Sequence, residues 1–70
     1  MYVIVKTIDT NNFEYFSMLA ASGIYTDANL AKAVIFPNVT IANKMKDVLN
    51  ALDSDITVTV KEIVLEDVNQ

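Results

Sequence analysis

The sequence has no cysteine, histidine, tryptophan or arginine, and it has one glycine and one proline. Without cysteine there is no disulfide, and without cysteine or histidine the usual zinc ligands are missing. One glycine cannot build a glycine-rich phosphate loop. No serine has a histidine to activate it as a nucleophile. We therefore expect a protein that is not an enzyme and that has no cofactor.

The charge balance is acidic, with a net charge of −4 and all five basic residues lysine. Arginine is the usual bidentate reader of phosphate and guanine, so direct nucleic-acid binding is not expected. No stretch reaches 18 apolar residues, and the first residues lack the basic start of a signal peptide. These features predict a cytoplasmic protein that does not bind membranes.

The chain has 70 residues, which predicts a single domain covering 1–70. Domains this small usually need disulfides, a metal or a partner subunit in addition to their own core. The first two are not expected here. The hydrophobic content of 53% therefore favours a dense core, a homo-oligomer, or both.

The N-terminal part of the chain predicts a β-hairpin over residues 2–19. Residues 2–8 and 13–19 are rich in β-branched and aromatic side chains, and turn-forming Asp and Asn residues separate them. The loop is either Asn11–Asn12 or the four residues from Asp9 to Asn12. The longer loop is preferred because the shorter one sets Asp9 opposite Glu14.

The rest of the chain predicts a short strand over 33–36 that Pro37 ends, a helix over about 39–52 that Asn38 caps, and a strand over 56–65. The segment 20–33 is less regular, with Gly23 at a bend and one helical turn after Thr26. The predicted fold class is α+β. It is one antiparallel sheet of three to four strands with a single amphipathic helix on one face.

Both hairpin loops predict the same two faces, because side chains alternate along a strand. One face would hold Tyr2, Ile4, Ile8, Phe13, Tyr15 and Leu19, and the other Val3, Val5, Phe16 and Met18. One helix covers only one face, so the second apolar face predicts packing against another copy. The alternative is that residues 20–33 fold over it. The predicted oligomer interface is Val3, Val5, Phe16, Met18, Ile63 and Leu65.

Several residues outside this interface are candidate contacts for a ligand or partner. Tyrosine rings can stack or anchor, and lysines contributed by two subunits could meet at an anionic small molecule. The close pair Asp53 and Asp55 lies in an expected turn, so we predict no metal site there. The candidates are Tyr2, Tyr15, Tyr25, Lys6, Lys61, Asp53 and Asp55.

The pattern of the whole chain resembles a class of small proteins of unknown function encoded by phages and prophages of Gram-positive bacteria. The matching positions are the start Tyr2–Lys6, Thr26–Asp27 followed by Leu30, Ala33, Ile35 and Phe36, Ala42 in the helix, and Val60–Val64 at the end. In place of Pro37–Thr40, such proteins commonly have acidic residues. The resemblance implies an accessory protein of the host cytoplasm and no catalytic residue.

Three functions follow as hypotheses. The first is a protein that binds and inhibits or regulates a host protein, such as an anti-phage defence component, with its acids facing a basic groove. The second is an oligomer that traps a nucleotide-like immune signal between subunits, in a pocket lined by tyrosine and lysine. The third is a structural or assembly module.

Overall fold

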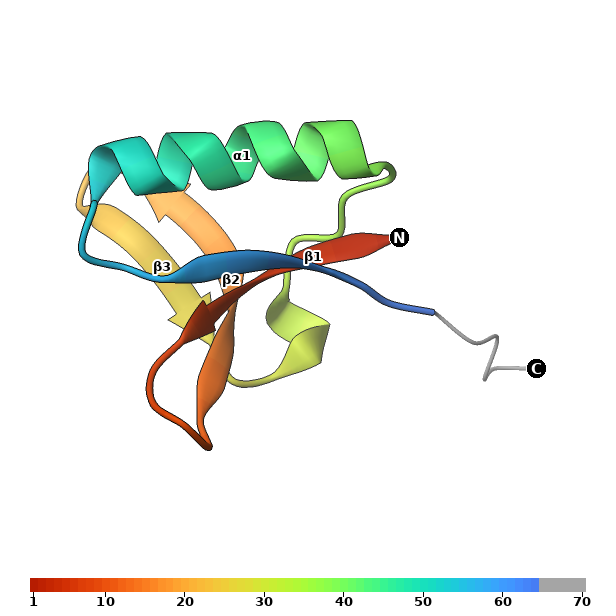
Figure 1. Ribbon diagram of the computed structural model, residues 1–70, viewed down its shortest axis with the longest axis horizontal. Helices are drawn as coiled ribbons and strands as arrows, with labels where there is room; N and C mark the ends of the chain where they lie inside the picture. The colour runs from red at the N-terminus through yellow and green to blue at the C-terminus, as the bar shows by residue number, and fades with distance from the viewer. Residues whose placement is uncertain (65–70) are drawn as a thin grey trace.

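A computed structural model of the protein describes residues 1–64, and its ribbon shows one helix lying across a twisted sheet (Figure 1). The four strands are antiparallel and lie in the order β3-β2-β1-β4. This confirms the predicted α+β class. In chain order the elements are β1 (Tyr2–Thr7), β2 (Phe13–Ala20), β3 (Gly23–Asp27), the 3-10 helix η1 (Leu30–Lys32), α1 (Val39–Leu52) and β4 (Val58–Glu62).

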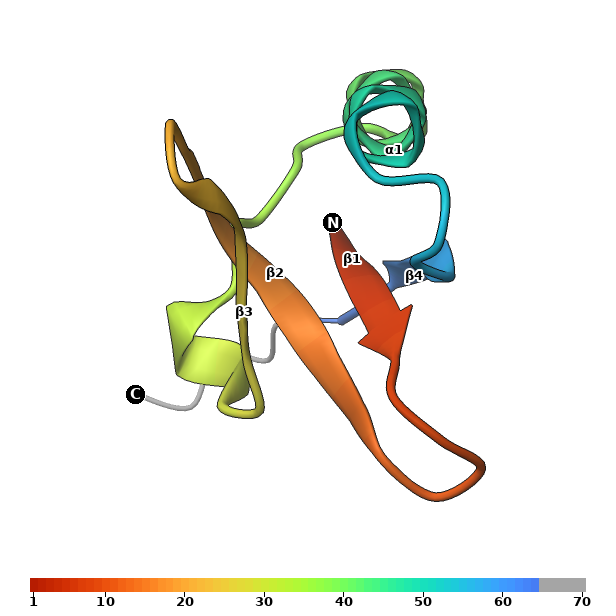
Figure 2. The same cartoon turned by 90° about the vertical axis from the view of Figure 1, so that its left-hand side faces the viewer.

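The helix α1 has the bounds that the sequence predicts. Its cap is Asn38, whose side-chain Oδ1 accepts a hydrogen bond from the backbone N–H of Ile41 at 2.9 Å. At the other end the N–H of Asp53 donates to the carbonyl of Leu49 at 3.0 Å. The helix buries Ala42 and Leu49 and packs mainly on β1 and β4, so it covers one half of the sheet (Figure 2).

The predicted strand over 33–36 is wrong. That segment forms a single bridge, in which the backbone groups of Phe36 and Tyr2 exchange hydrogen bonds of 2.8 and 2.9 Å. The fourth strand is β3 instead, which pairs with β2 through a tight turn ending at Gly23. There φ is +139°, a value that favours glycine. The predicted helical turn is present as η1, capped by the side chain of Asn29.

Strand β4 is shorter than the predicted 56–65. Backbone hydrogen bonds continue its pairing with the N-terminal strand on both sides, from Thr7 N–H to the Thr57 carbonyl and from Ile63 N–H to the Met1 carbonyl. Residues 56 and 57 nevertheless lie outside the strand proper, as do 63 and 64. The last predicted strand residue, Leu65, lies outside the described residues.

The first hairpin has a loop that neither expected alternative describes. The N–H of Asn12 donates to the Asp9 carbonyl at 3.3 Å, which closes a turn. The N–H groups of Ile8 and Asp9 both donate to the Asn12 carbonyl, at 3.0 and 3.1 Å. Two residues therefore face one, as in a β-bulge, and the first paired residues are Thr7 and Phe13.

The carboxylate of Asp9 holds this turn together. It accepts hydrogen bonds from the side-chain amide of Asn12 and from the N–H of Asn11, each at 2.9 Å. These bonds favour the ionised form of Asp9, so they hold the pKa of its carboxyl below the usual range. The Asn12 amide has the larger effect on this pKa, and the Asn11 N–H has the smaller one.

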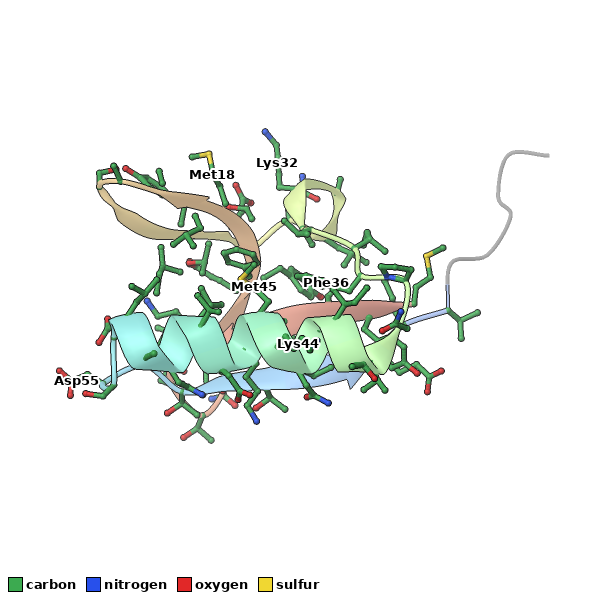
Figure 3. All side chains as sticks on the ribbon, turned by 90° about the horizontal axis from the view of Figure 1, so that it is seen from above. Met18, Lys32, Phe36, Lys44, Met45 and Asp55 are labelled. Atoms are coloured by element: carbon green, nitrogen blue, oxygen red, sulfur yellow. The ribbon has the colours of Figure 1, made fainter. Side chains whose placement is uncertain are left out.

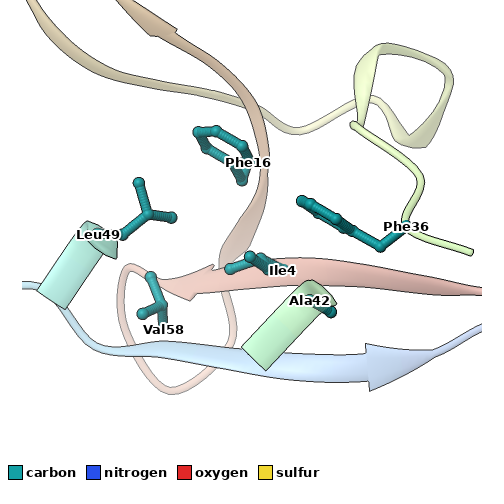
Figure 4. Packing of buried hydrophobic residues seen from close by; sticks show 6 residues of the cluster. All are labelled: Ile4, Phe16, Phe36, Ala42, Leu49 and Val58. Carbon is teal, nitrogen blue, oxygen red and sulfur yellow. The ribbon is translucent and has the colours of Figure 1, made fainter. Parts of the chain in front are cut away.

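The loop has one residue more than the preferred prediction, so β2 pairs with β1 in a register shifted by one residue. A shift of one residue moves every side chain of β2 to the opposite side of the sheet relative to β1. Val5 now pairs with Tyr15, which puts Phe16 beside Ile4 under α1. The predicted partition of faces is therefore wrong: Phe16 is 3% exposed and belongs to the core. The core cluster is Ile4, Phe16, Phe36, Ala42, Leu49 and Val58 (Figure 4).

Candidate binding sites

We call the side of the sheet that α1 covers the helix face, and the opposite side the far face. Strand alternation and pairing place many of the predicted contact residues on the far face. Tyr2 and Lys6 lie on the helix face instead, and Tyr2 packs against the core. The far face carries Val3, Val5, Phe13, Tyr15, Met18, Tyr25 and Lys61.

Three far-face side chains contact one another at the end of the sheet near the first hairpin loop. The rings of Phe13 and Tyr15 meet edge to face, with centroids 5.5 Å apart. The ammonium of Lys61 lies 5.7 Å from the centre of the Phe13 ring, within the range of a cation–π contact. Two predicted contact residues, Tyr15 and Lys61, are thus joined through Phe13.

This arrangement covers part of the apolar far face from within the subunit. Strand β1 lies between β4 and β2, so the Lys61 side chain crosses over β1 to reach Phe13. Val3 pairs with Lys61 and is fully buried, and Val5 is half-buried. The expected bare patch is therefore smaller than the sequence predicts, because two of its four hairpin residues, Val3 and Phe16, are buried within the subunit.

A second bulge turns Met18 and Tyr25 outward together. The pairing of β2 with β3 shifts between Phe16 and Met18, so Met18 pairs with Tyr25 on the far face. Met18 is 50% exposed and projects away from α1 (Figure 3), and Tyr25 is 44% exposed. The Tyr25 hydroxyl shares a hydrogen bond with Ser22 Oγ, and Ser17 Oγ donates to the Tyr25 carbonyl. The first bond restrains the Tyr25 side chain, and the second restrains its backbone.

A cleft lies on the helix face, where α1 leaves β2 and β3 uncovered. Its volume is about 330 Å³. Leu52, at the end of the helix, lies on one side of the cleft, and Leu19 and Ile24 lie on the other. Leu19 and Ile24 pair with each other across the second hairpin. Ala20, Ala21 and Ile56 complete the apolar lining, and Lys6 and Asp53 supply the charge.

Lys6 is the basic residue of this cleft. It pairs across the strands with Glu14, but the Glu14 carboxylate accepts a hydrogen bond from the Thr26 hydroxyl on β3. Within residues 1–64, no carboxylate oxygen lies within 4.0 Å of the Lys6 ammonium, the longest distance for a salt bridge. Lys6 is half-buried, so the cleft contains a cation without a charged partner from the described chain.

The two aspartates of the exit turn have a local role. Asp53 Oδ1 accepts a hydrogen bond from the N–H of Asp55 at 3.0 Å, which closes the turn after α1. Both aspartates are exposed, and Asp53 lines the cleft whereas Asp55 does not. In the described part of the chain, no three acidic, histidine or cysteine residues cluster as metal ligands would.

The remaining predicted interface residues are dispersed. Ile63 is half-buried, and Leu65 lies outside the described residues. Sequence reasoning missed Phe13, which is 44% exposed, because the wrong register placed it on the covered face. It also missed Leu19, Ile24 and Leu52 of the cleft. Two features of the sequence point to these residues. The predicted helix has apolar residues on its flank, and the predicted sheet is wider than one helix can cover.

Comparison of the chain with protein-family models, with curated proteins and with solved structures finds no match. Within residues 1–64, the one α-helix is too short to cross a bilayer.

Proposed function

We propose that the protein is a non-enzymatic accessory domain that binds a host protein through the far face of its sheet and so inhibits or regulates it. The observation that carries this proposal is the exposure of Phe13, Met18 and Tyr25 on one side of the sheet. The core of the domain lies on the other side. These three side chains therefore keep about half of their surface available to a partner.

The residue types on the far face support a protein partner. Aromatic residues and methionine are enriched at the centres of protein interfaces, where they bury much area and lose little conformational freedom. The Tyr25 hydroxyl already makes one local hydrogen bond, to Ser22 Oγ, which lowers the entropy cost of binding. The net charge of −4 favours a partner whose binding surface has a basic rim.

A second copy of the chain is the other occupant that this face could take. Two of the six interface residues predicted from the sequence are buried within the subunit, namely Val3 and Phe16. Their burial reduces the apolar area that a homodimer could cover there. The homodimer interface expected from the sequence is therefore not available in the form predicted.

Native mass spectrometry of the tagged protein purified from its host cell tests this proposal. Phe13→Ser alters the far face, and Leu52→Ser is the matched control because it places the same polar residue at the cleft. We expect a host protein at fixed stoichiometry with the wild type and with Leu52→Ser, and its loss with Phe13→Ser. Equal recovery with Phe13→Ser, or a homodimer as the sole complex, would refute the far face as the host-protein site.

A second candidate function is sequestration of a small anion, which Lys6 in the cleft favours because its ammonium has no salt bridge to a carboxylate within residues 1–64. The cleft has one lysine and no tyrosine. It therefore differs from the tyrosine- and lysine-lined pocket expected for a nucleotide-like signal between two subunits. Lys6 offers one positive charge to a ligand, and Asp53 in the same cleft disfavours a ligand with more than one negative charge.

A further inference from the structure

The cleft on the helix face has the size and lining of a small-molecule site. Its volume of about 330 Å³ is at the lower end of the range for ligand pockets, ~300–1,000 Å³. At about 30 Å³ for each water in the liquid, it has room for roughly eleven waters, or a ligand of about ten heavy atoms. Six of its nine lining residues are leucine, isoleucine or alanine, while polar and apolar atoms share its surface about equally. Such a wall suits a ligand that has both a hydrocarbon part and a charged group.

The polar groups of the cleft select the charge of the ligand. Glu14 is directed to Thr26, so the nearest cross-strand acid does not neutralise Lys6. An ammonium that is partly removed from water is stabilised by an anion that comes within hydrogen-bond distance. Asp53, the acid that lines the cleft, is engaged by the N–H of Asp55 and would repel a second negative charge.

We infer that this cleft binds a small apolar monocarboxylate. The carboxylate pairs with the ammonium of Lys6, and the hydrocarbon chain lies between Leu52 on the helix and Leu19 and Ile24 on the second hairpin. Asp53 excludes dicarboxylates and polyphosphates by repulsion. The inference uses the helix face and is independent of the host-protein site on the far face.

Octanoate, which has ten heavy atoms, is the probe for this site. Titration of the ¹⁵N-labelled protein, followed by two-dimensional NMR, gives both the dissociation constant and the residues that respond. We expect the amide signals of Lys6, Leu19, Ile24 and Leu52 to move together with one saturable constant. Octanol, which has the same chain without the charge, and octanedioate, which has a second carboxylate, should each bind at least tenfold more weakly.

Variants separate the role of Lys6 from general effects on the fold. Lys6→Met removes the charge and keeps a long side chain, and we expect it to weaken octanoate binding at least tenfold. Lys6→Arg keeps the charge and should bind within about threefold of the wild type. The matched control Lys61→Met removes a lysine from the far face, and Phe13→Ser alters that face; both should leave octanoate binding unchanged.

Three results would overturn the inference: no saturable shift up to 10-millimolar octanoate, equal affinity of Lys6→Met, or equal affinity for octanol. Should Lys6→Met fail to fold, the comparison of octanoate with octanol and octanedioate on the wild type decides alone. A failure of this test would leave the host-protein proposal standing, because Phe13 lies on the other side of the sheet.

Discussion

Two leucines three residues apart on α1 give a matched test of the packing. Leu49 is fully buried in the core cluster, whereas Leu52 is 61% exposed at the edge of the cleft. Replacing a buried leucine with alanine leaves a cavity and costs about 3–5 kcal/mol. Full burial of a leucine stabilises by ~1.5–3 kcal/mol, so the partly covered Leu52 should cost at most about 1 kcal/mol. Both changes alter intrinsic helix propensity equally.

The loss at Leu49 is large compared with the whole stability of the domain. At ~0.05–0.15 kcal/mol per residue, 70 residues have an unfolding free energy of about 3.5–10 kcal/mol. Urea denaturation followed by circular dichroism measures both variants. At a slope of about 1 kcal/mol per molar urea, Leu49→Ala should lower the midpoint by roughly 3 M or more and Leu52→Ala by 1 M or less.

A milder variant keeps this test usable if Leu49→Ala does not fold. Leu49→Val removes one methylene and should cost about 1 kcal/mol. Similar midpoint shifts for the alanine variants at positions 49 and 52 would refute the packing of α1 on β1 and β4. A larger shift at Leu52 would mean that the helix is rotated about its axis.

Three further predictions concern the turns and caps. Asn38→Ala removes the side-chain acceptor for the Ile41 N–H and should lower the unfolding free energy by ~0.5–2 kcal/mol, seen as a lower melting temperature; an unchanged melting temperature would contradict this cap. Gly23→Ala meets no atom within 4 Å, so the positive φ alone should cost ~1–3 kcal/mol in urea denaturation, and a stabilised variant would contradict that backbone conformation. The folded-state pKa of Asp9 is below its unfolded value of about 3.9, so its stabilisation is present above that pH and is lost as pH falls through the folded pKa. Asp9→Asn should therefore show a smaller loss of urea midpoint between pH 7 and pH 2.5 than the wild type, and an equal loss would contradict the hydrogen bonds to Asn11 and Asn12.

The helix and the fold class could be predicted because their signals are local. Asn38 stands before a stretch with apolar residues at helical spacing, and the bounds 39–52 follow from it. The apolar run 33–36 has the composition of a strand, but its backbone bonds to Tyr2 and Phe16 rather than to a full neighbouring strand. Conversely, the residues from Ile24 to Thr26 are β-forming and belong to β3. This strand was not predicted because the segment is short and follows Gly23.

The register of the first hairpin could not be predicted in the same way. It depends on whether one or two N–H groups bond to the Asn12 carbonyl, and the side chains of Ile8 and Asp9 do not indicate this. That one bond determines on which face of the sheet Phe13, Tyr15 and Phe16 lie. It therefore also determines which residues form the candidate sites. Tyr15 and Lys61 as contacts for a ligand or partner stay a prediction, and their meeting at Phe13 could not be predicted.

The measurement that tests this arrangement most directly is a nuclear Overhauser spectrum of the Phe16 ring protons. Phe16 shares the core cluster with Ile4 and Leu49, so its ring should show contacts to the methyl groups of both residues and none to Val5. Contacts from the Phe16 ring to the Val5 methyls, without contacts to Ile4, would show the other register. Phe13 and Tyr15 would then lie under the helix, and the proposed far-face binding site would be lost.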